Sequence, residues 1–283
     1  MAQNTVFIGL VSHSQSSFVQ SQGPSGLSAR LAQIFSNHGV SSQVQINTAN
    51  LFDEKEFELT AAMARASVRE EIRLESAWFR FLERRDRIGQ VVRVLGRWMW
   101  FGLKWRSNSQ TKELRRLLNI EYSHVDLYRR GVESGCDLVI ILEDDAFSVE
   151  PESLASSLIG LLDFPDVPKM INLSTSFSLS EIGIAHLLTQ VPSVAWSGVG
   201  AVFSSSRPAT NTVCAIAFRT DFLRDVVTDF DSQPLEPVVP IDWKLNASLM
   251  RLWASGSIGA GECWFIDPGP VLQLSMHQAP IEK

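Results

Sequence analysis

Residues 138–146 read Leu-Val-Ile-Ile-Leu-Glu-Asp-Asp-Ala, five apolar residues that run directly into three carboxylates. A short uninterrupted apolar run is typical of a strand buried on both faces, as in a parallel sheet. The three acids then stand at the carboxyl end of that strand, where open α/β sheets bind their ligands. The stretch therefore predicts an α/β fold with a candidate site at Glu143, Asp144 and Asp145.

Adjacent carboxylates repel one another unless a cation or hydrogen-bond donors offset their charge. In an extended strand, Glu143 and Asp145 point to one side and Asp144 points to the other. Two carboxylates on one side form part of a shell for Mg²⁺ or Mn²⁺, which water and substrate phosphates complete. The alternative is a solvated acidic turn after a strand, and the apolar run upstream favours a metal site.

The surrounding sequence resembles glycosyltransferase family 25, the lipooligosaccharide and collagen sugar transferases. Residues 120–146 read IEYSHVDLYRRGVESGCDLVIILEDDA. In the family, a Ser-His pair opens a helix, an aromatic residue follows, and a turn leads into a strand that ends in Leu-Glu-Asp-Asp. The residues that match are Ser123-His124, Tyr128 and Leu142-Glu143-Asp144-Asp145, and further similar stretches begin at Cys214, Pro240, Phe265 and Gln273. Order and spacing agree over about residues 118–278, whereas the family's Asn-Leu-Asp-Arg-Arg opening is absent.

The resemblance implies a metal-dependent glycosyltransferase with a GT-A-like fold, a Rossmann-like mixed and mostly parallel sheet flanked by helices. It implies a nucleotide-sugar donor, expected to be a UDP-sugar, a glycan or glycolipid acceptor, and inversion of the anomeric centre. Glu143 and Asp145 would hold Mn²⁺ or Mg²⁺ at the donor diphosphate, and Asp144 would bond ribose or sugar hydroxyls. Asp242, in a Pro-x-Asp pattern, is the candidate base; its alternative role is a helix N-cap.

Five further residues are candidates for the site. His277 is a candidate third metal ligand, because several glycosyltransferases of this general fold close the metal shell with a late histidine; a solvated tail histidine is the alternative. Ser123 and His124 are candidate donor contacts, or a helix cap. His13 and Arg30 flank the first loop, which leads into a helix N-terminus that can receive a phosphate; surface residues of both kinds are also common.

Composition favours one large α/β domain with a substantial core, since the chain has 283 residues and is 45% hydrophobic. We divide it into a nucleotide-binding half (1–53), a basic helical insertion (54–117) and a metal and acceptor half (118–283). No apolar run is long enough for a transmembrane helix, and the N-terminus does not read as a secretory signal. Three cysteines without a C-x-x-C pattern fit a reducing cytosol.

Charge is unevenly distributed along the chain. Residues 80–116 hold eleven basic and three acidic residues, a net +8, so the rest must carry −14 to give the chain's −6. Apolar residues recur there at helical spacing, with tryptophans at 98, 100 and 105 and a further one nearby at 78. This pattern is typical of a helix in the interface of an anionic membrane. The alternative is an amphipathic helix packed on protein; the acidic remainder disfavours nucleic acid as a partner.

The periodicity of the sequence predicts a βαβ opening followed by alternating elements. The expected strands are 5–11, 42–47, 138–142, 169–173, 213–218, 264–266 and 271–274, and the expected helices are 27–38, a long stretch over 54–117, 151–162, 220–229 and 243–254. Two other functions fit such a chain. One is a metal-dependent nucleotidyltransferase or phosphotransferase, and the other is a non-catalytic membrane-surface protein on a transferase-like fold.

Overall fold

The structure is a computed structural model that describes residues 4–12, 18, 23–47, 70, 73–74, 88–89, 91–92, 95–96, 99, 108–162, 168–174, 183–192, 198, 200–210, 212–233 and 239–277. Its strands are β1 (Thr5–Val11), β2 (Ser41–Asn47), β3 (Leu138–Glu143), β4 (Ala146–Phe147), β5 (Met170–Asn172), β6 (Leu188–Gln190), β7 (Ala201–Ser205), β8 (Ala215–Arg219), β9 (Cys263–Asp267) and β10 (Leu272–Gln273). The helices are α1 (Leu27–Asn37), α4 (Asn108–Glu133), α5 (Pro151–Leu162), α6 (Thr220–Asp231), α7 (Ile241–Ser255), α8 (Leu274–His277) and the 3-10 helix η2 (Ala185–Leu187).

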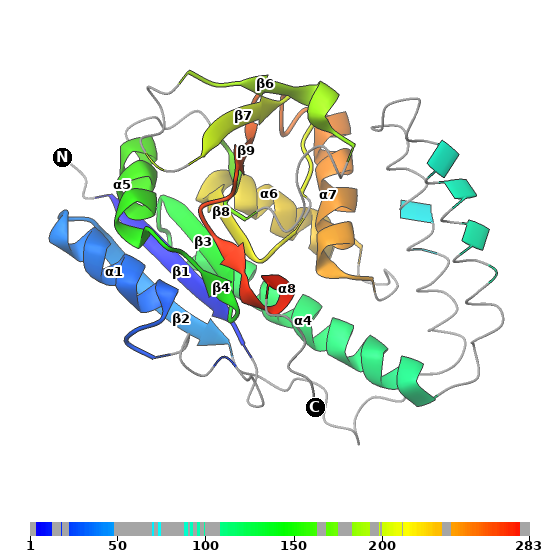
Figure 1. Ribbon diagram of the computed structural model, residues 1–283, viewed down its shortest axis with the longest axis horizontal. Coiled ribbons are helices and arrows are strands. Elements are labelled where there is room, and N and C mark those ends of the chain that lie inside the picture. The colour runs from blue at the N-terminus through cyan, green and yellow to red at the C-terminus, as the bar shows by residue number, and fades with distance from the viewer. Residues whose placement is uncertain are drawn as a thin grey trace.

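The main sheet has the strand order β2-β1-β3-β8-β5-β9-β7-β6 (Figure 1). Strands β2, β1 and β3 pair in parallel, as do β5 and β9. Strand β8 is antiparallel to both of its neighbours, and β7 is antiparallel to both β9 and β6. Six of the eight strands described in this sheet therefore run in one direction, which confirms the expected α/β class with a mixed, mostly parallel sheet.

Helices cover both faces of this sheet (Figure 1). Helices α1 and α5 pack on one face, and α4, α6 and α7 pack on the other. Alternate residues of β3 enter the two layers: Val139 and Ile141 face the α4 side, whereas Leu138, Ile140 and Leu142 face the α1 side. All five are at most 2% exposed, so the apolar run is buried on both faces as predicted.

Most expected elements agree with the structure to within about two residues, the usual uncertainty of helix and strand ends. The Ser123-His124 pair is an exception. Helix α4 begins at Asn108, so this pair lies in the middle of a helix and does not open one. Its expected role as a helix cap is therefore wrong. Most of the predicted basic helical stretch over 54–107 lies outside the described residues.

Helix α4 lies very close to β3 because of a glycine. A Cβ atom at Gly131 would come within 2.7 Å of Val139 Cγ1, which is closer than real Cβ contacts come. After α4, the chain turns back at Gly135, whose φ of +67° favours glycine, and enters β3 in the opposite direction. The amino-terminal half of the helix is thereby carried toward the carboxyl end of the strand.

Gly131→Ala should destabilise the fold, since the added methyl group meets a stiff β-branched side chain and must push α4 away from β3. We expect a loss of about 1–3 kcal/mol in the free energy of unfolding, measured by chemical denaturation. Gly160→Ala in α5 is the matched control, because nothing lies within 4 Å of a Cβ atom there. It should stabilise the chain by about 0.5–1 kcal/mol. Equal effects of the two substitutions would contradict the close approach.

Candidate metal centre

The three acids stand where the strand order reverses. The chain passes from β1 through α1 to β2 on one side of β1, and β3 lies on the other side. The carboxyl ends of β1 and β3 therefore flank a topological switch point, the usual ligand site of open α/β sheets. Ser12, directly after β1, donates a hydrogen bond from Oγ to Asp144 Oδ2 over 3.0 Å. This bond joins the two strand ends at the predicted place.

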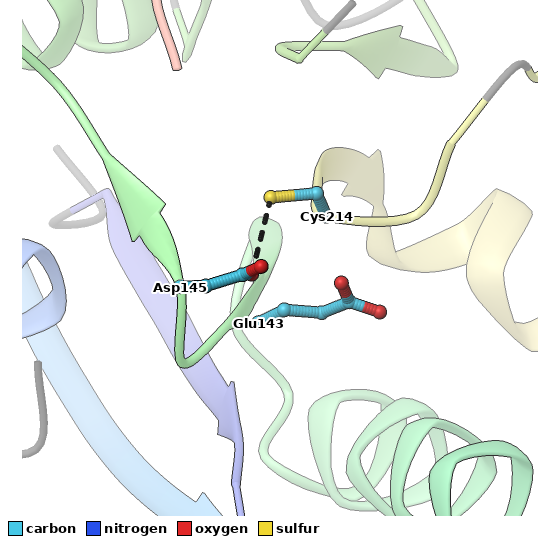
Figure 2. A group of neighbouring side chains, drawn as sticks. All are labelled: Glu143, Asp145 and Cys214. Atoms are coloured by element: carbon cyan, nitrogen blue, oxygen red, sulfur yellow. Dashed lines mark hydrogen bonds between the residues drawn. The ribbon is translucent and has the colours of Figure 1, made fainter. Parts of the chain in front are cut away.

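Glu143 and Asp145 form a compact group with Cys214. One ligand atom from each residue, a carboxylate oxygen or the thiol sulfur, lies within 4.8 Å of the other two. Figure 2 shows Cys214, which precedes β8, beside Asp145, and its thiol donates to Asp145 Oδ1 over 3.8 Å. Asp145 and Cys214 are buried, whereas Glu143 is half-buried. Glu143 and Asp145 thus gather as predicted, and Asp144 turns to Ser12. The predicted reason, alternation along an extended strand, is wrong, because β3 ends at Glu143 and residues 144–145 form a turn.

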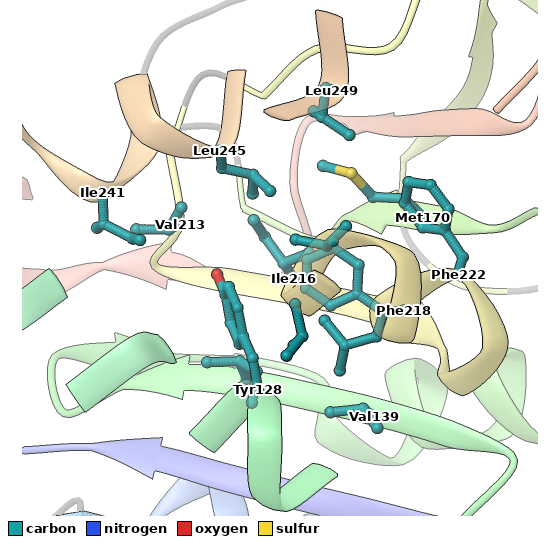
Figure 3. Close-up of a cluster of buried hydrophobic side chains, with 14 of the residues drawn as sticks. Tyr128, Val139, Met170, Val213, Ile216, Phe218, Phe222, Ile241, Leu245 and Leu249 are labelled. Atoms are coloured by element: carbon teal, nitrogen blue, oxygen red, sulfur yellow. The ribbon is translucent and has the colours of Figure 1, made fainter. Parts of the chain in front are cut away.

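His124 reaches this group from α4. Glu143 continues the side of β3 that faces α4, and its Oε1 lies 3.2 Å from His124 Nε2. Tyr128, one turn further along α4, packs edge-on against the His124 ring with centroids 5.9 Å apart. Figure 3 shows Tyr128 among the apolar side chains of the same layer, including Phe218. Burial, and then the charge of Glu143, raise the pKa of Tyr128 far above its usual range, so this phenol stays neutral. Its contact with the imidazole is therefore one of ring packing.

The C-terminal segment closes over the carboxylates from another direction. Gln273 donates from Nε2 to Glu143 Oε2 over 3.2 Å, and Ser275 donates from Oγ to Asp145 Oδ2. The backbone N–H of Leu274 donates to the carbonyl oxygen of Asp145 over 2.9 Å. Strand β10 is held there by antiparallel pairing with β4, which follows Asp145 directly. Residues 272–275 are therefore held beside the carboxylates by hydrogen bonds to the acidic residues themselves.

The negative charges of Glu143, Asp144 and Asp145 have few positively charged partners. Within the described part of the chain, no lysine or arginine forms an ion pair with Glu143, Asp144 or Asp145, and His124 is the only basic side chain paired with one of them. Burial is the main reason why the pKa of Asp145 is raised, and the charges of Glu143 and Asp144 add to it. Burial, followed by the charges of Glu143 and Asp145, holds the pKa of the Cys214 thiol well above its usual range.

The ligand atoms of this group fit a hard divalent cation. The carboxylate oxygens of Glu143 and Asp145 are ligands that Mg²⁺ and Mn²⁺ prefer, and a cation would offset the repulsion that raises the pKa of Asp145. The Cys214 thiol is a softer donor that stays protonated at neutral pH without a metal, because its pKa is raised. The two carboxylates are therefore the primary ligands of this candidate site.

The structure places Asp242 in the first turn of α7, where Pro240 occupies the N-cap position. The alternative role of Asp242 as the N-cap is therefore wrong. Asn246, one turn later, accepts from the Thr210 N–H over 2.9 Å and donates to the Thr210 carbonyl over 2.8 Å. Thr212 Oγ1 in turn accepts from the N–H of Cys214 over 3.2 Å. Helix α7 is thus tied to the segment that carries Cys214 to the carboxylates of Glu143 and Asp145.

For the remaining candidate residues, the structure shows no hydrogen bond or ion pair with the three acids among the described side chains. Arg30 pairs with Glu152 of α5 over 3.4 Å, both side chains being largely exposed, and is not brought to the carboxylates. Ser123 is buried in α4 beside His124. His277 is the last residue of α8, two residues after Ser275, and its side chain lies outside the described part, as does all of His13.

Sequence reasoning did not identify Ser12, Cys214, Gln273 or Ser275 as parts of the site. A signal existed for three of them, because Cys214 opens one of the stretches similar to family 25 and Gln273-Leu-Ser is another. Neither stretch carries a charged pattern that indicates ligand chemistry. Nothing in the sequence around Ser12 distinguishes it from the other serines of the first loop.

No protein-family model matches the chain, and no curated protein matches it significantly.

Asp145 should make stability depend on pH in the absence of metal. Its ordinary pKa is 3.8 and its folded pKa is higher, so between the two values the folded chain holds a proton that the unfolded chain has lost. The free energy of unfolding therefore falls as pH rises through this window. Asp145→Asn removes that titration. In metal-free buffer, the free energy of unfolding of the variant, measured by denaturation, should increase relative to that of the wild type as pH rises from below 3.8 to neutrality. A difference between the two that does not change with pH would contradict the assignment.

Proposed function

We propose that the chain is a metal-dependent glycosyltransferase with a GT-A-like fold, which moves a sugar from a UDP-sugar donor to a glycan or glycolipid acceptor with inversion. The reaction type comes from the family 25 resemblance of residues 120–146 and of the later stretches. The single observation that supports it best is the carboxylate group at the switch point of a mixed sheet. Glu143 and Asp145 gather there without an ion-paired lysine or arginine in the described part of the chain.

Sugar transfer requires that the diphosphate leaving group be neutralised, that the acceptor hydroxyl lose a proton, and that water be kept away. A divalent cation held by Glu143 and Asp145 would supply the first requirement, as an electrophile at the diphosphate. His124 and Gln273 fix the Glu143 carboxylate from two sides, and Ser275 fixes Asp145. These bonds keep both carboxylates in one orientation, which a preorganised site needs.

Asp242 is the proposed base that takes the proton from the acceptor hydroxyl. It lies in the first turn of α7 and is half-buried, and α7 is tied through Asn246, Thr210 and Thr212 to the chain that carries Cys214. Asp144, half-exposed beside Ser12, is the proposed contact for donor hydroxyls.

Metal and nucleotide should bind together at this site. UDP with Mn²⁺ should raise the melting temperature of the wild type more than either alone, because a ligand that binds only the folded chain stabilises it. Asp145→Ala should abolish the Mn²⁺-dependent part of the shift. Glu150→Gln, which removes an exposed charge close by in the sequence, is the control and should keep the shift. An unchanged shift in Asp145→Ala would overturn the metal assignment.

Asp242 should matter for turnover more than for donor binding. Asp242→Asn is nearly isosteric but cannot accept the proton, so transfer should fall by about 10²-fold or more with similar donor affinity. The measurement is UDP release from a panel of UDP-sugars with glycan and glycolipid acceptors, together with the thermal shift by UDP and Mn²⁺. Near-normal transfer would exclude Asp242 as the base. Nucleotide cleavage without sugar transfer would support the nucleotidyltransferase or phosphotransferase alternative instead.

A further inference from the structure

Five aliphatic side chains in the middle of the chain are exposed to solvent. They are Ile88, Val91, Val92, Leu95 and Met99, with exposed fractions of 73%, 43%, 65%, 57% and 68%. Their backbones are helical. We call this set the apolar stripe. Exposed aliphatic side chains that gather in one place are unusual in a monomeric protein and mark an interaction surface.

The sequence spacing of these residues predicts that they share one side of a helix. Steps of three or four residues separate Ile88 from Val91 and Val92, Leu95 follows Val91 by four, and Met99 follows Leu95 by four. Residues three and four apart are neighbours on a helix surface. The spacing therefore predicts a stripe that continues over about three turns, which is the form of a surface that lies flat against an apolar layer.

The charge around the stripe indicates what covers it. Residues 80–116 carry a net +8, and the sequence of the stripe's own stretch includes Arg93 and Arg97, which lie outside the described residues. A second copy docked stripe to stripe would bring two such basic segments together, and their repulsion opposes that arrangement. Nucleic acid would match the charge but offers little to bury five aliphatic side chains. An anionic lipid surface satisfies both the charge and the apolar stripe.

We propose that the apolar stripe lies in the interface of an anionic membrane, with the basic residues of 80–116 at the lipid headgroups. No described helix is long and apolar enough to cross a membrane. The remaining −14 of charge would be repelled by the same surface, so the acidic part of the chain is turned away from it. This inference is independent of the proposed sugar transfer.

Vesicle co-sedimentation of the full chain tests the proposal. Vesicles of phosphatidylcholine with phosphatidylglycerol should bind the chain at low salt, and binding should fall as salt is raised because screening weakens the attraction. Pure phosphatidylcholine vesicles should bind it weakly. The double variant Val92→Gln with Leu95→Gln keeps the charge but removes apolar burial, so its affinity for the anionic vesicles should drop by about tenfold or more.

Val44→Gln with Ile46→Gln is the matched control. These two side chains of β2 are also exposed, at 40% and 41%, and lie outside the stripe. The control should bind anionic vesicles as the wild type does, and both double variants should keep the wild-type melting temperature. Absence of binding at low salt, equal losses in both double variants, or equal binding to neutral vesicles would overturn the proposal. Dimerisation without vesicle binding would also overturn it. In analytical ultracentrifugation, the wild type would then have the mass of a dimer, and the double variant Val92→Gln with Leu95→Gln would have the mass of a monomer.

Discussion

The close contact between α4 and β3 is the constraint on which the arrangement of the site depends. Gly131 has no side chain, so the helix backbone lies against Val139. Because α4 runs opposite to β3, the residues two turns before Gly131 lie beside the end of the strand. His124 is one of them, and the same alternation that buries Val139 and Ile141 on the α4 side presents Glu143 to its ring. One packing contact in the core therefore orients a carboxylate at the surface end of the sheet.

The acidic group is held together by donors from segments that are distant in the sequence. Ser12 follows the first strand, His124 lies in α4, and Gln273 and Ser275 come near the C-terminus. Hydrogen bonds to a carboxylate favour its charged form, yet burial and the neighbouring charges keep the pKa of Asp145 raised. The donors thus fix the geometry of the carboxylates without neutralising them. Such a balance is what a preorganised cation site requires.

Charge is divided between two regions with different roles in our account. The carboxylates at the switch point attract a cation and, through it, an anionic donor, whereas the basic segment 80–116 attracts an anionic surface. A glycolipid acceptor would bring the two together, because its lipid part belongs in the layer that the apolar stripe contacts. The two proposals rest on separate residues, so either can hold without the other.

The sequence by itself determined the fold class, the doubly buried strand and the position of the three acids. A short apolar run followed by charged residues is typical of a buried strand with a site at its carboxyl end. Strand alternation did not decide which acids meet, because β3 ends at Glu143 and residues 144–145 form a turn. The prediction that Ser123-His124 opens a helix is wrong because it comes from the family resemblance, and Ser is a preferred N-cap residue. The structure places the pair inside α4, which begins at Asn108. The tertiary structure alone decided that Cys214, Gln273 and Ser275 meet Asp145 and Glu143. These contacts join positions up to 130 residues apart, and only strand order and packing set such distances.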